Sequence, residues 1–217
     1  MRVESQPAFI LHARAWRETS LLLEVFSRDH GRIGLLARGV RSARARITRA
    51  TLEPFHLLSV DWAGTGELPN LRAAEMVGAP RRFMDDALLS GLYVNELLVR
   101  LTARADPHPA LFERYAVLLE ELAATDSLAW TLRRFERDLL GQLGYGLQLD
   151  CEAESGEPLR ADADYIYAPE LGPVPAQSRQ PGTTVRGSAL LALHEDAKPA
   201  HEDLAALRRV LRAVIAS

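Results

Sequence analysis

The sequence predicts an α+β protein: a small barrel of five strands, followed by a mainly helical part. Up to about residue 80, short apolar runs rich in β-branched and aromatic residues alternate with turn signals. Beyond Pro80 the spacing of apolar residues changes from two to near 3.6. Residues 1–82 hold 13 basic and 8 acidic residues, whereas residues 83–217 hold 13 and 21. We therefore expect a basic domain over residues 1–80 and an acidic domain over residues 81–217.

Five candidate strands account for the first domain. Gly31 supplies the positive φ needed by a hairpin turn after the second strand, and a second glycine-bearing turn occupies residues 63–66. The connection between the third and fourth strands is longer than the others. An oligonucleotide-binding (OB) fold has this layout, and an SH3-like barrel fits almost as well on periodicity alone. The expected strands cover residues 8–14, 19–27, 32–39, 55–62 and 67–75.

The long connection is rich in arginine. From His30 to Leu52 there are six arginines and no acidic residue. Charge runs are usually solvated surface, but the lack of any compensating acid favours a mobile arm that contacts a phosphate backbone. The planar guanidinium fork binds phosphate oxygens in pairs and can stack on bases. The candidate contacts are Arg32, Arg38, Arg41, Arg44, Arg46 and Arg49.

Aromatic side chains are the second feature of single-strand binding sites, because bases stack on them. Trp16 lies at a strand end between Arg14 and Arg17, so these three residues complete the candidate DNA-binding set. Phe9 and Phe26 lie inside apolar runs, and we expect them to be buried in the core.

The second domain begins with three amphipathic helices. The first covers residues 85–105, the second spans Leu111 to Leu122, and the third runs from about Leu128 to Leu143. Gly144 ends the third helix where a left-handed residue is usual. Periodicity then fades, so residues 147–185 are expected to form a short hairpin or an irregular subdomain. Helices return at residues 188–194 and 204–215.

No pattern of catalytic or metal-ligating residues emerges. A single cysteine, Cys151, excludes an intrachain disulfide and falls short of the clustered ligands that zinc needs. The glycines of GQLGYG follow a helix instead of a strand, so they lack the context of a nucleotide loop. We expect no enzyme activity, no metal and no cofactor. Without a signal-peptide profile or a long apolar run, we expect a cytoplasmic protein that does not contact a membrane.

Several runs resemble the RecO family of bacterial recombination mediators. The similarity covers residues 9–41 and LEPFHLL at 52–58, then SGLYVNELLVRL at 90–101, LRRFERDLLGQLGYGLQLD at 132–150 and SGEP at 155–158. Zinc-bearing members of the family carry cysteines after the LGYGL motif, where this sequence has only Cys151. It therefore resembles the members that lost the metal, which implies that residues 147–185 form an irregular, zinc-finger-like segment without metal. The family's C-terminal Gly-Gly and Pro-Leu-x-Ser-Arg segment has no counterpart before Ser217.

The resemblance implies an OB-fold domain, a helical domain and a non-catalytic role in RecF-pathway DNA recombination, repair and the DNA damage response. Such proteins bind single- and double-stranded DNA and anneal complementary strands. They also bind the C-terminal tail of the single-stranded-DNA-binding protein, and they act with RecR to load RecA. A nucleoid-associated location in the cytoplasm follows. Two alternatives stay open, a protein–protein adaptor whose basic arm docks an acidic partner and a hydrolase with an unrecognised site.

The expected docking site for the acidic partner tail is the third helix. There Leu132, Phe135 and Leu139 form an apolar stripe, and the flanking cations Arg133, Arg134 and Arg137 are the candidate tail-binding residues. Alternatively, these arginines merely pair with Glu136, Asp138 and other carboxylates.

Overall fold

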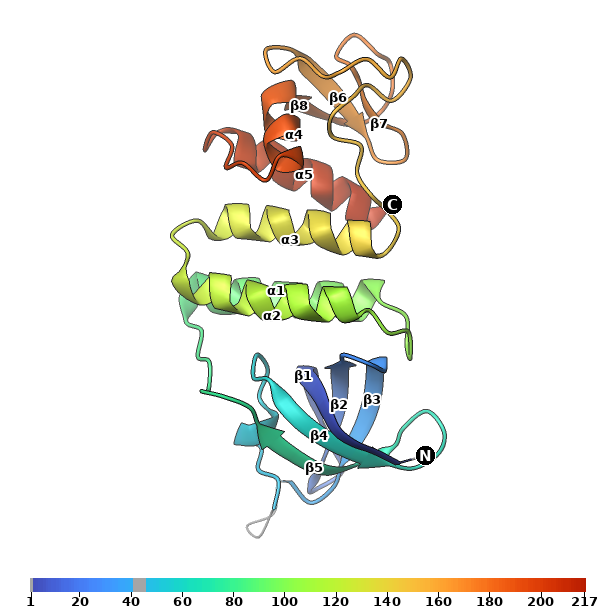
Figure 1. The fold of residues 1–217 in the computed structure, drawn as a ribbon, viewed down its shortest axis with the longest axis vertical. Helices are drawn as coiled ribbons and strands as arrows, with labels where there is room; N and C mark the ends of the chain where they lie inside the picture. The colour runs from blue at the N-terminus through green and yellow to red at the C-terminus, as the bar shows by residue number, and fades with distance from the viewer. Residues whose placement is uncertain (1, 41–45) are drawn as a thin grey trace. The chain divides into compact units, whose positions relative to one another are not determined.

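The computed structural model describes residues 2–40 and 46–217. The chain divides into two compact units, Met1–Ala124 and Thr125–Ser217. The first unit begins with a closed barrel of strand order β1-β2-β3-β5-β4, in which β3 pairs parallel with β5 (Figure 1). This crossed order is that of an OB fold, so the predicted fold class is confirmed. The strands are β1 (Arg2–Trp16), β2 (Ser20–Ser27), β3 (Gly31–Ala37), β4 (Leu58–Ala63) and β5 (Asn70–Met76).

The barrel interior follows from the period-2 alternation of its strands. On β2, Leu21, Leu23 and Val25 are buried inside the barrel, where they pack with Leu35, Val60 and other apolar side chains. The turn into β3 has Gly31 at φ +65°, and Gly31 pairs with Ser27 across the hairpin. The glycine predicted to make this turn therefore does so. A 3₁₀-helix, Ala50–Leu52, lies in the connection to β4.

Two helices complete the first unit, α1 (Asp85–Leu101) and α2 (Pro109–Ala124). Phe9 and Phe26 are fully buried, as predicted, with their rings 5.1 and 5.6 Å from the ring of Phe112 on α2. The Asn95 amide on α1 donates to the Leu11 carbonyl at 3.0 Å and accepts from the Tyr115 hydroxyl at 2.6 Å. The predicted boundary at residue 80 ends the barrel, whereas the compact unit continues to Ala124 because the helices cover these aromatic side chains.

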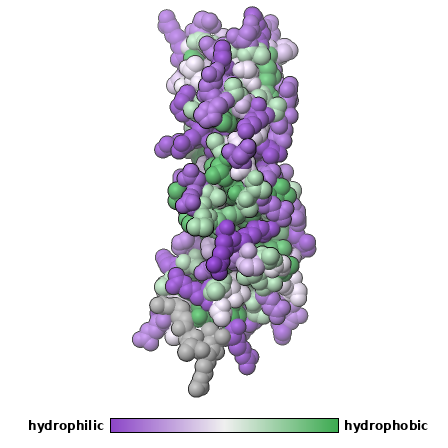
Figure 2. All heavy atoms as spheres, turned by 90° about the vertical axis from the view of Figure 1, so that its left-hand side faces the viewer, coloured by the Kyte–Doolittle hydropathy of each residue, from purple (hydrophilic) through white to green (hydrophobic). Residues whose placement is uncertain are grey.

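The solvent side of α1 is partly apolar. Leu89 and Leu92 of α1 are 64% and 45% exposed, and Met84, which directly precedes the helix, is 74% exposed. In Figure 2, hydrophobic surface gathers over the helical part of the first unit. In the ranges 2–40 and 46–217, no helix is both long enough and apolar enough to cross a membrane.

The second unit opens with α3 (Leu128–Gln142). Gly144 follows at φ +87°, the Tyr145 amide donates to the Leu140 carbonyl at 2.8 Å, and the Gly144 amide donates to the Gly141 carbonyl at 3.2 Å. These are the two hydrogen bonds of a Schellman motif, so the predicted helix end is confirmed. The remaining elements are β6 (Asp164–Ala168), β7 (Gly172–Pro175), β8 (Thr183–Arg186), α4 (Gly187–His194) and α5 (Asp203–Ala216).

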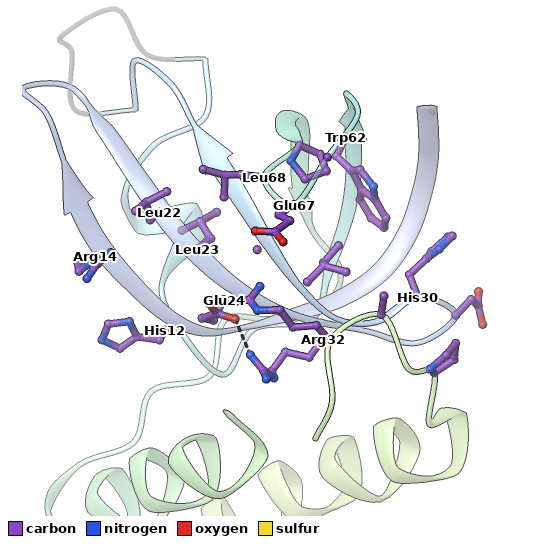
Figure 3. A pocket seen from close by; sticks show the side chains of 18 residues that line it. His12, Arg14, Leu22, Leu23, Glu24, His30, Arg32, Trp62, Glu67 and Leu68 are labelled. Atoms are coloured by element: carbon purple, nitrogen blue, oxygen red, sulfur yellow. Dashed lines mark hydrogen bonds and ion pairs between the residues drawn. The ribbon is translucent and has the colours of Figure 1, made fainter. Parts of the chain in front are cut away.

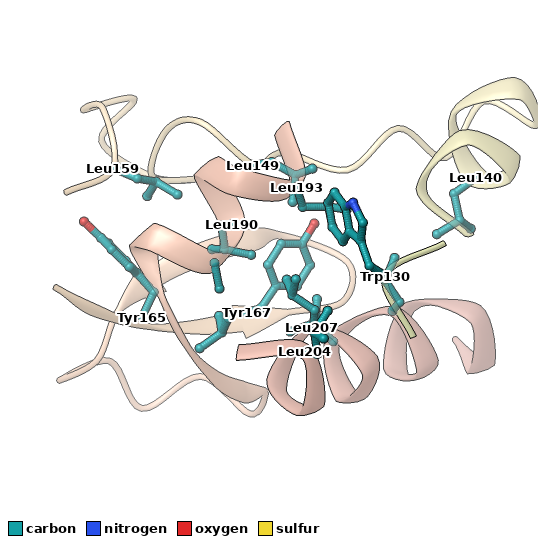
Figure 4. Close-up of a cluster of buried hydrophobic side chains, with 14 residues drawn as sticks. Trp130, Leu140, Leu149, Leu159, Tyr165, Tyr167, Leu190, Leu193, Leu204 and Leu207 are labelled. Carbon is teal, nitrogen blue, oxygen red and sulfur yellow. The ribbon is translucent and has the colours of Figure 1, made fainter. Parts of the chain in front are cut away.

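The segment expected to be a short hairpin or an irregular subdomain holds a three-stranded antiparallel sheet of order β7-β6-β8. Tyr165 and Tyr167 of β6 pack with Leu190 of α4, Leu207 of α5 and Trp130 of α3 (Figure 4). These strands have four or five residues each, which is too short for period-2 alternation to be visible in the sequence.

Candidate nucleic-acid interface

A groove of about 890 Å³ lies on the outer face of the barrel (Figure 3). Strands β2 and β3 form its floor, and the C-terminal half of β1 forms one side. The turn between β4 and β5 and the connection between α1 and α2 close the rest. OB folds bind oligonucleotides on this β2–β3 face. The polar side chains that line the groove include His12, Arg14, Glu24, Arg32 and Arg104.

The register of the strands brings the groove residues to one face. His12 lies opposite Glu24, Arg14 lies opposite Leu22, and Glu24 lies opposite Gly34 on β3. Gly34 has no side chain to fill the space, and a Cβ there would lie 2.9 Å from the Arg104 guanidinium. A side chain at position 34 would therefore displace the end of the Arg104 side chain, which lies over this part of the floor.

The α1–α2 connection lies directly against the β2–β3 hairpin. The Ala105 amide donates to the Arg32 carbonyl at 3.0 Å. A Cβ on Gly31 would lie 2.1 Å from the Asp106 carbonyl oxygen, so only glycine permits this approach. Arg104, Ala105 and Pro107 thus form a wall of the groove although they are distant from its floor in sequence.

Two arginines share one carboxylate in the groove. Arg32 Nη1 lies 3.0 Å from Glu24 Oε2, and Arg104 Nη2 contacts the other carboxylate oxygen. Arg32 also donates to the Thr102 carbonyl at 2.9 Å, and only 12% of its side chain is exposed. Since two guanidinium groups face one carboxylate, the cluster keeps one net positive charge. Arg32, a predicted DNA contact, holds this wall together through the same bonds.

The rim of the groove carries Arg14 and, along the same strand, Trp16. His12, Arg14 and Trp16 alternate along β1, so their side chains share a face. Trp16 is 41% exposed, which leaves part of its ring open to a stacking partner. The neighbouring Arg17 is also exposed. Trp62, in contrast, is buried with its indole 5.2 Å from the His30 ring.

The predicted arm is described only in part. Arg38, Arg46 and Arg49 are exposed. Among the residues that the structure describes, none of these three is ion-paired to a carboxylate. Arg41 and Arg44 lie outside the described residues.

Sequence reasoning missed Arg104, Glu24 and His12. Arg104 and Glu24 are 80 positions apart, so no local spacing links them. Only the docking of the α1–α2 connection on the hairpin brings them together. The alternation of His12, Arg14 and Trp16 on one strand was the available signal for His12.

The three arginines predicted to bind a partner tail all form ion pairs within the second unit. Arg133 is buried with Glu136 at 2.5 Å, Arg134 binds Asp196 at 2.8 Å, and Arg137 binds Asp138 and Asp196 at 2.8 and 2.9 Å. Burial by itself raises the pKa of the Asp196 carboxyl, but the bonds to Arg134 and Arg137 outweigh it and lower the pKa below its usual range. These pairs correspond to the alternative in which the arginines neutralise nearby carboxylates.

No three or more histidine, cysteine or acidic side chains are arranged to hold a metal ion in the part of the chain that the structure describes. Around Cys151, backbone hydrogen bonds join residues 150–152 to residues 157–159. The Leu159 amide donates to the Asp150 carbonyl at 2.9 Å, and the Glu152 amide donates to the Glu157 carbonyl at 2.8 Å. The Gln148 side chain donates to the Cys151 sulfur at 3.0 Å.

The strand order of the barrel and the groove on its β2–β3 face define an OB-fold protein. The family model described as "Recombination protein O N terminal" matches residues 1–80, and the one described as "Recombination protein O C terminal" matches residues 86–216. The chain belongs to the RecO family of DNA repair proteins, which supports a role in DNA repair.

Relatives named DNA repair protein RecO match the chain over nearly its full length. The protein of Xanthomonas campestris pv. campestris (strain B100) is 46% identical over 221 residues, which cover 99% of this chain and 90% of the relative. That of Xanthomonas oryzae pv. oryzae (strain PXO99A) is also 46% identical, over 99% of this chain and 91% of the relative. That of Stenotrophomonas maltophilia (strain K279a) is 46% identical over 219 residues, with 100% and 91% covered.

Proposed function

We propose that this protein binds single- and double-stranded DNA through the barrel groove and the arginine-rich connection, and that it anneals complementary strands without catalysing a reaction. The observation that carries the proposal is the groove on the β2–β3 face, whose rim holds Arg14 and where Arg32 and Arg104 share the single carboxylate of Glu24. The exposed Trp16, on strand β1 with Arg14, adds a surface for base stacking.

Annealing by this route is an electrostatic effect. Two single strands repel each other through their phosphates, and arginines that neutralise phosphates lower this repulsion. Because the contacts are to the backbone, the Watson–Crick edges of the bases stay free to pair. Binding of this kind carries little sequence preference.

The wider proposal is a recombination mediator of the RecF pathway. It would bind the C-terminal tail of the single-stranded-DNA-binding protein, act with RecR and help load RecA. Family membership supports this proposal. The ion pairs of Arg133, Arg134 and Arg137 leave fewer donors for a tail on α3 than the sequence suggested. Arg133→Ala and Arg134→Ala variants, titrated with an acidic tail peptide, test that site.

Salt titration tests DNA binding directly. Each neutralised phosphate contributes about −0.7 to the slope of log affinity against log salt for single strands and about −0.9 for duplex DNA. We expect Arg41→Ala/Arg44→Ala/Arg46→Ala to flatten the slope by about 2 for single strands, equally for all sequences. The measurement is fluorescence anisotropy of a labelled oligonucleotide at several salt concentrations.

The matched control is Arg72→Ala/Arg82→Ala/Arg100→Ala, which removes three exposed arginines of the first unit that do not line the groove. It should keep the parent's slope. If the arm variant also keeps that slope, the arm does not contact DNA and the adaptor alternative gains support.

A further inference from the structure

The last helix has two contrasting faces. Leu204, Leu207, Val210 and Leu211 of α5 are buried in the core of the second unit. The other face is exposed and carries three cations. At 100° per residue Arg208 and Arg212 lie 40° apart, with Arg209 on the same side. The exposed residues of this face are Ala205, Arg208, Arg209, Arg212 and Ala216.

These arginines differ from most others in the second unit, because their charge is not neutralised. Arg133, Arg134 and Arg137 on α3 bind carboxylates, as described above. Arg160 and Arg186 bind Asp162 and Glu202 at 3.0 and 3.6 Å. Arg208, Arg209 and Arg212 have no carboxylate partner among the described residues.

No acid on α5 opposes this charge. Asp203 in the first turn is the acidic residue of the helix, and it is only 7% exposed. The exposed face therefore holds three positive charges in a part of the chain where acids outnumber bases. Beyond about 8–10 Å, salt screens the acids elsewhere in the domain, so a nearby anion responds mainly to the three guanidinium groups.

The geometry suits a nucleic-acid backbone. Residues four apart on a helix are separated by about 6 Å along its axis, close to two nucleotide steps of about 3.4 Å along a duplex strand. The buried apolar face fixes the helix, so the arginines are presented from a rigid support. Guanidinium groups bind phosphate oxygens in pairs, which suits them to phosphate contacts.

We propose that the exposed face of α5, formed by Arg208, Arg209 and Arg212, binds the phosphate backbone of a second nucleic-acid strand. The inference rests on the proposed function, because a molecule that holds two strands at once brings them together for annealing. The barrel groove and arm hold one strand, and α5 holds the other.

The test uses the full-length protein and two labelled single-stranded oligonucleotides that are not complementary. A donor dye on one strand and an acceptor on the other report capture of both strands by energy transfer. Arg208→Gln/Arg209→Gln/Arg212→Gln should bind the first strand with the parent's affinity. It should bind the second at least tenfold more weakly, with a salt slope flatter by about 2, as three lost contacts of about 0.7 each imply. Annealing of complementary strands should slow in parallel.

The matched control is Arg160→Gln/Arg179→Gln/Arg186→Gln, which removes the same charge from exposed positions of the same unit. It should capture both strands, and circular dichroism melts verify that both variants fold. Parent-like capture by the α5 variant overturns the inference while leaving the groove intact. The inference is also overturned if the α5 variant loses binding of polyglutamate but keeps binding of DNA, because the helix would then bind an acidic polypeptide. If the parent binds no strand, the proposed function itself fails.

Discussion

Glu24 illustrates how one residue changes the charge that two arginines bring to the barrel groove. Its carboxylate is shared by Arg32 and Arg104, so these cations are partly neutralised before any ligand arrives. Neither arginine could be assigned to this cluster from the sequence, because Arg104 comes from the α1–α2 connection. Arg32 was predicted as a DNA contact on charge alone, and its bonds to Thr102 became visible only in three dimensions.

We predict that Glu24→Gln strengthens DNA binding and weakens the fold. Removing the carboxylate charge leaves two cations without their partner, which raises the attraction for phosphates by up to about one contact in the salt slope. The same change costs stability, on the order of 1 kcal/mol because the pair is partly exposed to solvent. Anisotropy titrations and thermal melts should move in opposite directions. Loss of both affinity and stability would contradict a purely electrostatic role for Glu24.

Tyr115 and Tyr167 predict how stability responds to alkaline pH. Burial raises the pKa of Tyr167 to about 12 and that of Tyr115 further still. Above pH 10 the unfolded chain loses these phenolic protons while the folded chain keeps them, so stability falls as pH rises. For Tyr167 the loss is roughly 1.4 kcal/mol per pH unit between about pH 10 and 12. Urea unfolding of Tyr167→Phe should show a shallower decline than the parent.

The control for this experiment is Tyr145→Phe, because Tyr145 is 69% exposed. The free energy of unfolding of Tyr145→Phe should decline with rising pH as steeply as that of the parent. An equal decline in the parent and in Tyr167→Phe would show that the Tyr167 phenol does not carry the effect.

At the scale of elements, the long periodic segments were predictable and the short ones were not. The three helices and the five barrel strands have enough turns or alternations to show their period. Gly31 and Gly144 marked a turn and a helix end because each conformation needs a positive φ. For the β6–β8 segment only a short hairpin or an irregular subdomain could be predicted, because packing against α4 and α5 stabilises the sheet and its strands are too short to show alternation.

The segment around Cys151 should keep its fold without metal. The backbone hydrogen bonds between residues 150–152 and 157–159 close the loop that zinc ligands would otherwise hold. We therefore expect a chelator to leave the melting temperature unchanged, since no binding free energy is lost. Calorimetry with and without the chelator, together with metal analysis of the purified protein, makes the measurement. Stoichiometric zinc whose removal lowers the melting temperature would contradict this.

At the scale of the whole molecule, family-model boundaries and compact units divide the chain differently. The N-terminal family model ends at residue 80, whereas the first compact unit ends at Ala124. The difference consists of α1 and α2, whose residues Phe112, Tyr115 and Asn95 contact the barrel strands. A sequence period shows that a helix has an apolar face, but not which element that face covers.

We predict that a fragment of residues 1–124 folds cooperatively and that one of residues 1–80 does not. In the shorter fragment Phe9 and Phe26 are no longer packed against α2 and become exposed to solvent. This exposure lowers the free energy of unfolding by about 1.5–3 kcal/mol for each side chain. That loss is a large share of the stability of a small domain. Denaturant unfolding of both fragments, followed by circular dichroism, makes the comparison. Equal midpoints would show that the helices contribute nothing to the barrel.

The closure of the barrel has a dynamic consequence. Strands β1, β2 and β3 are joined by long antiparallel ladders. Strand β3 pairs with β5 at Leu36 and Asn70, where the Leu36 amide donates to the Pro69 carbonyl at 2.9 Å. Backbone openings cost least where the fewest hydrogen bonds must break, so amide exchange is expected to be fastest along this seam. Pro69 also lines the groove. We therefore expect local opening at the β3–β5 edge of the groove, while the β1–β2 and β2–β3 ladders stay paired.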